Sequence, residues 1–302
     1  MNGIVDSPTD VAFPLWYHAD IDRVGACQAA RSSFWGEVEV VDTAGSADGT
    51  RPSANCTLFS GNRLLATLNP ADRAILESGA EVVELERDTV LFDAGGEVGA
   101  SYFPAAGAMI SLVLFMHDGR TVEVATIGKE GAAGGIVSCG SAPAFARAVV
   151  QMSGPALRVP IGAIEIAKSR SAHVRSLFCR YADALLAQVM QSVACNAFHP
   201  IEARCCRWLL TAHDRVEGEV IPLTQEYLAE MLGVQRTSVS PVAKQLQDKG
   251  LIRYRRGRIE ILDRARLERG ACECYGTVER HFETVLPEPK PQKLIDTGSG
   301  IA

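Results

Sequence analysis

The chain has 302 residues, of which 47% are hydrophobic, and this length is typical of two domains with flanking segments. Its formal net charge is −6, so the chain as a whole is acidic. The longest strongly apolar run, residues 109–116, is too short to span a bilayer. The N-terminus lacks the basic start and apolar stretch of a signal peptide. We therefore expect a cytoplasmic protein without a membrane partner.

Two segments at the ends of the chain are expected to lack a packed core. Residues 1–60 are rich in Ser, Thr, Asp, Gly and Ala and show little hydrophobic periodicity, which predicts a disordered extension. Residues 276–302 are assigned to a C-terminal tail, in which the Pro and Gly content after residue 287 also predicts disorder. The folded part is therefore expected within residues 61–275.

Residues 61–170 alternate between short apolar strands and turns that contain glycine. After a helical segment over residues 62–78, runs such as 109–114 and 121–127 have the composition of strands. Between these two runs, Asp118-Gly119 is a strong hairpin signal. Many short strands joined by glycine turns are typical of a jelly-roll-like β-barrel.

Residues 171–198 show the periodicity of one long helix. Val174, Leu177, Tyr181 and Leu185 recur at helical spacing and form a heptad-like stripe. A stripe of this length between two domains predicts a dimerisation helix, so we expect a homodimer. Packing of the stripe against the chain's own barrel is the alternative.

Residues 199–275 are expected to form a winged helix-turn-helix domain. Thr224 is placed to cap a first amphipathic helix, and Gly233 supplies the tight turn that a second helix needs. The second helix begins near Gln235. Two short strands around the basic turn at residues 255–258 then form the wing. The predicted fold class is α+β, with an N-terminal barrel, a long helix and a C-terminal winged helix-turn-helix.

A basic island coincides with this last domain. Between Gln235 and Arg258 the chain carries seven Lys or Arg residues and a single acid, Asp248. DNA binding draws much of its affinity from phosphate neutralisation, which requires such an island rather than a basic chain. The segment therefore predicts a double-stranded DNA operator as partner, and a solvated helical hairpin followed by a polar β-hairpin is the alternative. The residues expected to contact DNA are Thr224, Gln235, Arg236, Thr237, Ser238, Ser240, Lys244, Arg255, Arg256 and Arg258.

The order of barrel, long helix and winged helix resembles the CRP/FNR superfamily of bacterial transcription regulators over about residues 62–275. The specific part is the motif Leu228-Ala229-x-x-Leu232-Gly233-x-x-Arg236-x-x-Val239, followed by Leu246 and Gly250-Leu251-Ile252. In this family the position of Arg236 contacts a base or a phosphate at the start of the recognition helix. The resemblance implies a homodimer on a two-fold operator, with RNA polymerase as a candidate further partner.

The barrel resembles the family's cyclic-nucleotide-binding domain, but it departs from that domain where the nucleotide binds. It matches at Gly95, Tyr102-Phe103-Pro104, Asp118-Gly119 and Gly128-x-Glu130-Gly131. The family then places a Glu after a Gly to hold the ribose, and later an Arg followed by Ser or Thr to hold the cyclic phosphate.

This chain lacks both of those nucleotide contacts. Residues 131–134 read Gly-Ala-Ala-Gly without the Glu, and Arg147 is followed by Ala148. A buried phosphate without charge-assisted partners is poorly stabilised, so we expect a degenerate effector site and no requirement for cAMP. The candidate effector residues are Gly131, Gly134 and Arg147, and a surface arginine on a barrel strand is the alternative for Arg147.

One pair among the nine cysteines has a spacing that suits chemistry. Cys272 and Cys274 can bind a soft metal or oxidise, but a zinc site needs further ligands, for which Glu273, Glu279 and His281 are nearby candidates. A lone pair is a weak signal, so we expect neither a metal nor a cofactor. A redox- or ligand-sensing module that acts through protein partners is the alternative to a DNA-binding regulator.

No catalytic constellation accompanies the barrel in the sequence. The six histidines are scattered without metal spacing, and neither a phosphate-binding P-loop nor a nucleophile elbow occurs. An enzyme with an accessory DNA tether therefore has no support, and we expect no enzymatic activity. Salt-dependent binding to duplex DNA distinguishes a regulator from a module that acts through protein partners.

Overall fold

The computed structural model describes residues 54–136, 143–216 and 218–286. All described residues lie in one compact unit, Arg51–Ala302. The predicted extension up to residue 53 and the segment after residue 286 lie outside the described residues. Among the described helices, none is both long enough and apolar enough to cross a membrane.

Three short helices precede the first strand, namely α1 (Ala54–Gly61), α2 (Arg63–Ala66) and α3 (Pro70–Glu77). Residues 54–60 are thus helical, in contrast to the disorder predicted for them. The buried side chain of Asn62 joins these helices to the strands. Its Oδ1 accepts a hydrogen bond from the backbone N–H of Leu64 at 3.1 Å, and its Nδ2 donates to the carbonyl oxygen of Gly131 at 2.8 Å.

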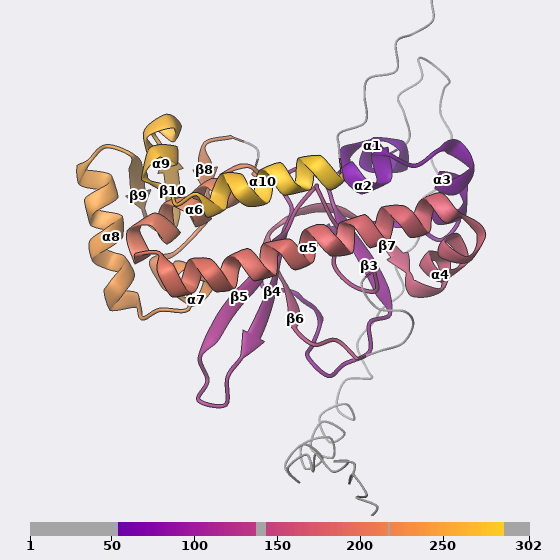
Figure 1. Cartoon of the computed structure of the whole chain (residues 1–302), viewed down its shortest axis with the longest axis horizontal. Helices are drawn as coiled ribbons and strands as arrows, with labels where there is room; N and C mark the ends of the chain where they lie inside the picture. The colour runs from indigo at the N-terminus through magenta and orange to yellow at the C-terminus, as the bar shows by residue number, and fades with distance from the viewer. Residues whose placement is uncertain (1–53, 137–142, 217, 287–302) are drawn as a thin grey trace, which may run out of the picture. The chain divides into compact units, whose positions relative to one another are not determined.

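Two antiparallel sheets form the β part of the fold, with strand orders β1-β7-β3 and β2-β6-β4-β5 (Figure 1). Phe103, Ile110 and Leu157 contribute from both sheets to one buried core. The β4–β5 hairpin turns at Asp118-Gly119, where Gly119 has a φ of 84°. The predicted jelly-roll-like architecture and its hairpin are therefore confirmed. The strands are β1 (Glu81–Leu85), β2 (Val90–Phe92), β3 (Ala100–Pro104), β4 (Met109–Phe115), β5 (Thr121–Ile127), β6 (Arg147–Met152) and β7 (Gly154–Pro160).

The long helix α5 (Ala172–Phe198) follows the short helix α4 (Ile161–Arg170). Val174, Leu177, Tyr181 and Leu185 are buried within the chain's own core, with exposed fractions of 0%, 0%, 1% and 9%. The Tyr181 hydroxyl donates to the carbonyl oxygen of Ala132 at 2.9 Å. The predicted helix is confirmed, but the prediction that this stripe pairs two chains is wrong. The apolar residues of this stripe pack against the barrel instead, because the barrel covers that face of the helix.

The remaining elements form the C-terminal part. The wing strand β10 pairs with both β9 and β8. The elements are α6 (Ile201–His213), β8 (Val220–Ile221), α7 (Gln225–Leu232), α8 (Arg236–Asp248), β9 (Ile252–Arg255), β10 (Arg258–Ile261), α9 (Arg264–Gly270) and α10 (Cys274–Val285). The predicted order of barrel, long helix and winged helix-turn-helix is therefore confirmed.

Helix α10 returns from the winged domain and lies along α5 (Figure 1). Phe282 and Leu286 are 6% and 2% exposed and belong to the same core as Leu177 and Tyr181. Residues 276–286 are therefore part of the folded unit, although the sequence assigned them to a tail. The apolar positions that carry this packing are few and far apart, which explains why composition alone missed them.

Candidate nucleic-acid interface

The first helix of the helix-turn-helix, α7, is set by its two caps. Oγ1 of Thr224 accepts a hydrogen bond from the backbone N–H of Tyr227 at 3.1 Å. Gly233 ends the helix in the left-handed region with a φ of 63°, and a Cβ at this position would lie 3.0 Å from the Val122 side chain. The Thr224 hydroxyl, predicted to contact DNA, therefore serves the helix terminus.

The second helix, α8, buries one face and exposes the other. Val239, Ala243 and Leu246 are 0%, 2% and 0% exposed and pack inward. Arg236 and Lys244 lie on the exposed face, at the start and in the middle of the helix. This is the geometry of a recognition helix, because an exposed face with reaching side chains is what enters the major groove.

The wing is a tight two-residue hairpin between β9 and β10. Arg255 pairs with Arg258 across the two strands, and the turn residues Arg256 and Gly257 have φ angles of 42° and 76°. Positive φ at both central residues is the type I′ turn that suits the twist of a hairpin. Three arginines, Arg255, Arg256 and Arg258, are thus exposed at one hairpin tip.

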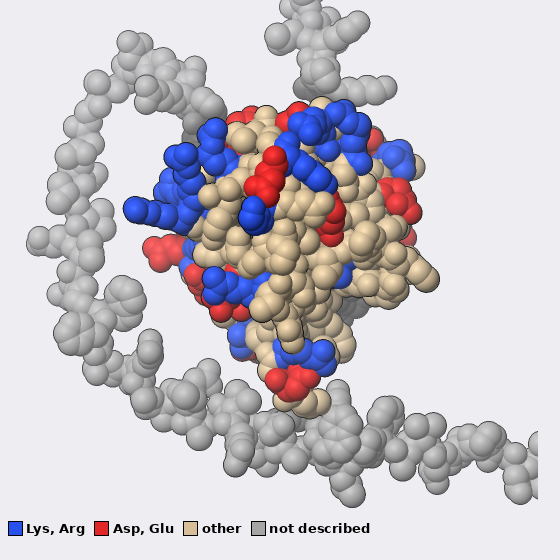
Figure 2. All heavy atoms as spheres, turned by 90° about the vertical axis from the view of Figure 1, so that its left-hand side faces the viewer, with Lys and Arg blue, Asp and Glu red and all other residues tan. Residues whose placement is uncertain are grey.

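The seven cations of the basic island divide into two groups. Lys244, Lys249 and Arg253 form ion pairs with Asp248, Glu202 and Glu260, each at 2.7 Å. In the part of the chain that the structure describes, the other four form no ion pair: Arg236, Arg255, Arg256 and Arg258. Figure 2, which views this end of the unit, shows Lys and Arg side chains gathered over the upper and left parts of the face.

The remaining predicted contact residues differ in how free their side chains are. The Ser240 hydroxyl donates to Oε1 of Gln225 at 2.9 Å and thereby joins α8 to α7. The Thr237 hydroxyl lies 3.5 Å from Oε1 of Gln235, at the exposed N-terminus of α8. Ser238 is half-buried next to them. Gln235, Arg236, Thr237 and Ser238 therefore lie together at the N-terminus of α8, and the three wing arginines lie at the hairpin tip. The hydroxyls of Thr224 and Ser240 instead form hydrogen bonds within the helix-turn-helix.

The winged domain also packs directly on the β4–β5 hairpin, which the sequence did not indicate. Nε1 of Trp208 donates to Oε2 of Glu123 on β5 at 3.1 Å. In addition, Arg87, in the turn between β1 and β2, donates to the carbonyl oxygen of Pro222 at 2.9 Å. Glu123 is half-buried at this contact, and desolvation raises the pKa of its carboxyl to about 7. A single acidic residue in a strand pattern gives no sign that a tryptophan 85 residues away will be its partner.

The predicted effector residues do not come together. Arg147 forms an ion pair with Asp93 at 2.7 Å and lies 4.4 Å from the Phe115 ring centroid, so it has the surface role that the sequence left as the alternative. Gly131 serves packing, because a Cβ there would lie 2.5 Å from the Tyr181 hydroxyl. Gly134 alone of the three lines a cavity of about 410 Å³ between the barrel and α5.

This cavity between the barrel and α5 is apolar, as its lining shows. Leu112, Leu114, Val124, Leu185 and Val189 contribute side chains, and no charged residue is among the described residues that line it. A cyclic phosphate placed there would lose its hydration without gaining an ionic partner. The cavity therefore suits an apolar ligand better than a nucleotide.

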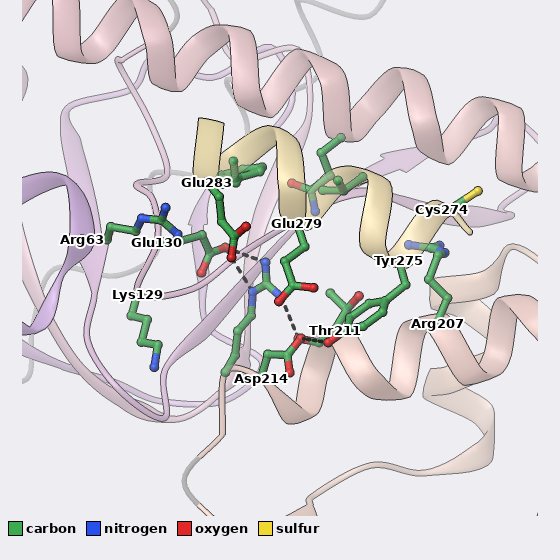
Figure 3. A pocket seen from close by; sticks show the side chains of 14 residues that line it. Arg63, Lys129, Glu130, Arg207, Thr211, Asp214, Cys274, Tyr275, Glu279 and Glu283 are labelled. Atoms are coloured by element: carbon green, nitrogen blue, oxygen red, sulfur yellow. Dashed lines mark hydrogen bonds and ion pairs between the residues drawn. The ribbon is translucent and has the colours of Figure 1, made fainter. Parts of the chain in front are cut away.

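A second cavity, of about 220 Å³, is lined by several charged side chains and lies where α6 and α10 meet the barrel (Figure 3). Nη2 of Arg215 pairs with Oε1 of Glu130 at 2.6 Å, and the Tyr275 hydroxyl donates to Oδ2 of Asp214 at 2.8 Å. Cys274 and Arg207 lie at one end of this cavity. The ion pair between Glu130 and Arg215 joins the barrel to the segment that follows α6.

Comparison with known proteins assigns the C-terminal part to a family. Residues 203–270 match the model of the Crp-like helix-turn-helix domain. No curated protein matches the chain by sequence.

Several solved structures share the fold at low sequence identity. FixK2 from Bradyrhizobium japonicum aligns with a TM-score of 0.56 at 16% identity, over 64% of this chain and 98% of that one. A CRP/FNR-family transcriptional regulator from Thermus thermophilus aligns with a TM-score of 0.52 at 19% identity, over 63% and 98%. The c-di-GMP responsive global regulator CLP of Xanthomonas campestris aligns with a TM-score of 0.52 at 16% identity, over 64% and 99%. The described fold is therefore the fold of these regulators.

Proposed function

We propose that the chain is a transcription regulator of the CRP/FNR type that binds a two-fold DNA operator as a homodimer, a proposal supported by its Crp-like helix-turn-helix domain and by its fold. In this proposal, α8 enters the major groove and the wing follows the adjacent backbone. The protein acts by binding and not by catalysis.

The observation that carries the proposal is the set of four exposed arginines without an ion pair in the described residues, Arg236, Arg255, Arg256 and Arg258. The chain as a whole has a net charge of −6, so carboxylates are abundant, yet these guanidinium groups are left without one. Duplex DNA supplies the anions that such groups bind, with phosphates along the backbone and guanine edges in the major groove. We therefore assign Arg236 to the groove and the three wing arginines to phosphates.

Dimerisation is proposed through the outer face of α5, not through the stripe that the barrel covers. Leu186, Met190 and Val193 are 55%, 59% and 67% exposed and recur at spacings of four and three residues. Apolar residues at this spacing form the seam of a helix pair. A two-fold axis along this seam would present two copies of α8 to successive major grooves.

The effector site is proposed to be degenerate toward cyclic nucleotides. The apolar lining of the cavity beside α5 and the pairing of Arg147 with Asp93 leave no cation for a cyclic phosphate in the described part of the cavity wall. We propose that DNA binding does not require cAMP. This agrees with the absence of the ribose-binding Glu from residues 131–134.

A genome-wide footprint followed by titration with one recovered operator tests the proposal. We expect a palindromic footprint and an affinity that falls steeply with salt, by about 0.9 in the logarithmic slope for each phosphate contact. The variant Arg255→Ala/Arg256→Ala should lower that slope. Binding that is independent of salt, or protection without two-fold symmetry, would contradict the proposal.

A further inference from the structure

Four potential metal ligands meet at one place outside the DNA-binding face. The side chains are those of Cys195, His199, Cys272 and Cys274, and one ligand atom of each lies within 4.8 Å of those of the other three. Sγ of Cys195 lies 3.5 Å from Sγ of Cys272, and Sγ of Cys274 lies 3.4 Å from Nδ1 of His199. The three cysteines are buried, and the histidine is half-buried.

We propose that these four residues form a binding site for one zinc ion per chain. Three thiolates and one imidazole are a common tetrahedral set for structural zinc. Binding requires the thiols to lose their protons, so zinc uptake releases protons to the solvent.

The spacing of the sulfur atoms favours one ion over a cluster. Zinc–sulfur bonds of about 2.3 Å at tetrahedral angles place two sulfurs about 3.8 Å apart. The observed separation of 3.5 Å between Cys195 and Cys272 is close to this value. A disulfide requires about 2.05 Å, so both thiols are free at this distance. The site therefore needs little movement to close around a single ion.

Neighbouring side chains hold the ligands in position, as they do around many metal sites. Nε2 of His199 lies 3.2 Å from Oε2 of Glu273, which leaves Nδ1 directed at Cys274. A carboxylate on the second nitrogen fixes the tautomer and orients the ring of a metal-binding histidine. Nε2 of Gln191 also donates a hydrogen bond to Sγ of Cys274 at 3.0 Å.

Two arginines supply positive charge beside the thiols. Zinc with three thiolates and a neutral imidazole carries one net negative charge, which is costly to bury alone. Arg204 is 7% exposed, and its Nε is buried without a hydrogen-bond partner in the described structure, as is Nε of Arg207. These guanidinium groups therefore offset the charge of the loaded site.

The cavity where α6 and α10 meet the barrel offers a path for the ion. Cys274 and Arg207 lie at one end of it, beside Thr211 and Tyr275 (Figure 3). A hydrated ion can therefore approach the thiolate of Cys274 through an opening lined by charged side chains instead of through the apolar core.

The four ligands of the site come from the two segments that flank the winged domain. Cys195 and His199 lie where α5 ends, just before the chain enters the winged domain. Cys272 and Cys274 lie where the chain leaves that domain and begins α10. One ion would therefore link the segments that precede and follow the DNA-binding domain and would fix both to the C-terminal end of α5. The sequence predicted no metal and offered Glu273, Glu279 and His281 as further ligands. In the structure Glu273 pairs with His199, and His281 pairs with Asp183 at 3.0 Å.

Metal analysis of the full chain, purified under reducing conditions without chelators, tests the proposal. We expect about one zinc per chain. Titration of the thiols with an organomercurial should release this zinc in proportion to the thiols that have reacted. Cobalt(II) added to the zinc-free chain should produce the intense visible bands and the near-ultraviolet thiolate charge-transfer band of a tetrahedral site. Failure to retain zinc together with failure to produce these cobalt bands would overturn the proposal. A Cys195–Cys272 disulfide in protein purified without oxygen, or bound iron with sulfide, would also overturn it.

Variants locate the ion and exclude a general effect of removing a thiol. Cys195→Ser and Cys274→Ser should abolish cobalt binding, and the exposed Cys179→Ser on the same helix should leave it unchanged. If the serine variants fail to fold, Glu273→Gln remains informative because its carboxylate is exposed and only orients His199. It should weaken metal binding roughly tenfold to a hundredfold. Unchanged metal affinity in the folded variants would place the ion elsewhere. Neither measurement uses DNA, so the operator proposal stands or fails separately.

Discussion

Four arginines of the winged domain differ from Arg147 of the barrel, because no carboxylate in the described structure pairs with them. On the barrel, Arg147 has Asp93 at 2.7 Å and the Phe115 ring beneath it, so its charge and its flat face are both used within the chain. On the winged domain, Arg236 and Arg256 are exposed and have no carboxylate within ion-pair distance in the described structure. An arginine satisfied inside the chain is structural, whereas a cluster left unsatisfied indicates an anionic partner outside it.

The two faces of α5 also differ in whether their apolar side chains are covered within the chain. The largest predicted effect is on dimerisation through the exposed face. Leu186→Glu/Val193→Glu on the exposed face should convert the dimer to monomers. Four apolar side chains per dimer at roughly 1.5 kcal/mol each sum to about 6 kcal/mol, and the four new charges repel. Sedimentation velocity at micromolar concentration measures the result.

Two controls accompany the dimer variant. Ile166→Glu, at a position 47% exposed on α4, should leave the dimer intact. Leu177→Glu/Leu185→Glu should unfold the chain instead of separating dimers, because it places charge inside the chain's own core. A parent protein that sediments as a monomer would refute the proposed seam.

The second prediction concerns the unpaired arginine at the start of α8. Arg236→Ala should weaken operator binding by about 2–6 kcal/mol, because each of two symmetric base contacts contributes roughly 1–3 kcal/mol. Fluorescence anisotropy with a labelled operator measures the change. Arg170→Ala, at an exposed position on α4, is the matched control and should bind as the parent does. Equal affinity for the two variants would show that the unpaired arginine is not a base contact.

A third prediction concerns the half-buried carboxyl of Glu123, where the two regions meet. The folded-state pKa of Glu123 is raised from its usual 4.5 to about 7, so between these values the folded chain holds a proton that the unfolded chain has lost. The contribution of Glu123 to the free energy of unfolding should therefore be fully present below pH 4.5, fall by about 3 kcal/mol as pH rises to about 7, and then level off. Glu123→Gln should remove this component. Denaturant titrations of both proteins across this range measure it, and parallel pH profiles would contradict it.

The smallest predicted effect is on the barrel arginine. Arg147→Ala should lower stability by about 1 kcal/mol or less, because its ion pair is partly exposed. It should not change operator affinity. Calorimetry should detect no cAMP binding to either the parent or the variant. Micromolar cAMP binding that depends on Arg147 would make this arginine a ligand-binding residue and erase the contrast with the winged domain.

The winged helix-turn-helix was predictable because its signals are local. Thr224, Gly233 and the turn at Arg256-Gly257 specify caps and turns through their own backbone conformations. Hydrophobic periodicity likewise predicted the length of α5 and the strands of the jelly roll. These features depend on residues a few positions apart, so one sequence contains all the information that they need.

Only the tertiary structure determines which surface each apolar face of a helix packs against. Both faces of α5 carry apolar residues at helical spacing, and only the position of the barrel shows that Leu177 and Tyr181 face inward while Leu186 and Met190 face outward. The same holds for Cys195 and Cys272, which are 77 residues apart and whose sulfur atoms lie 3.5 Å from each other. The sequence alone determined which local elements form, because their signals are short-range. The pairing of distant faces depends on how the whole core is buried, and local spacing does not encode it.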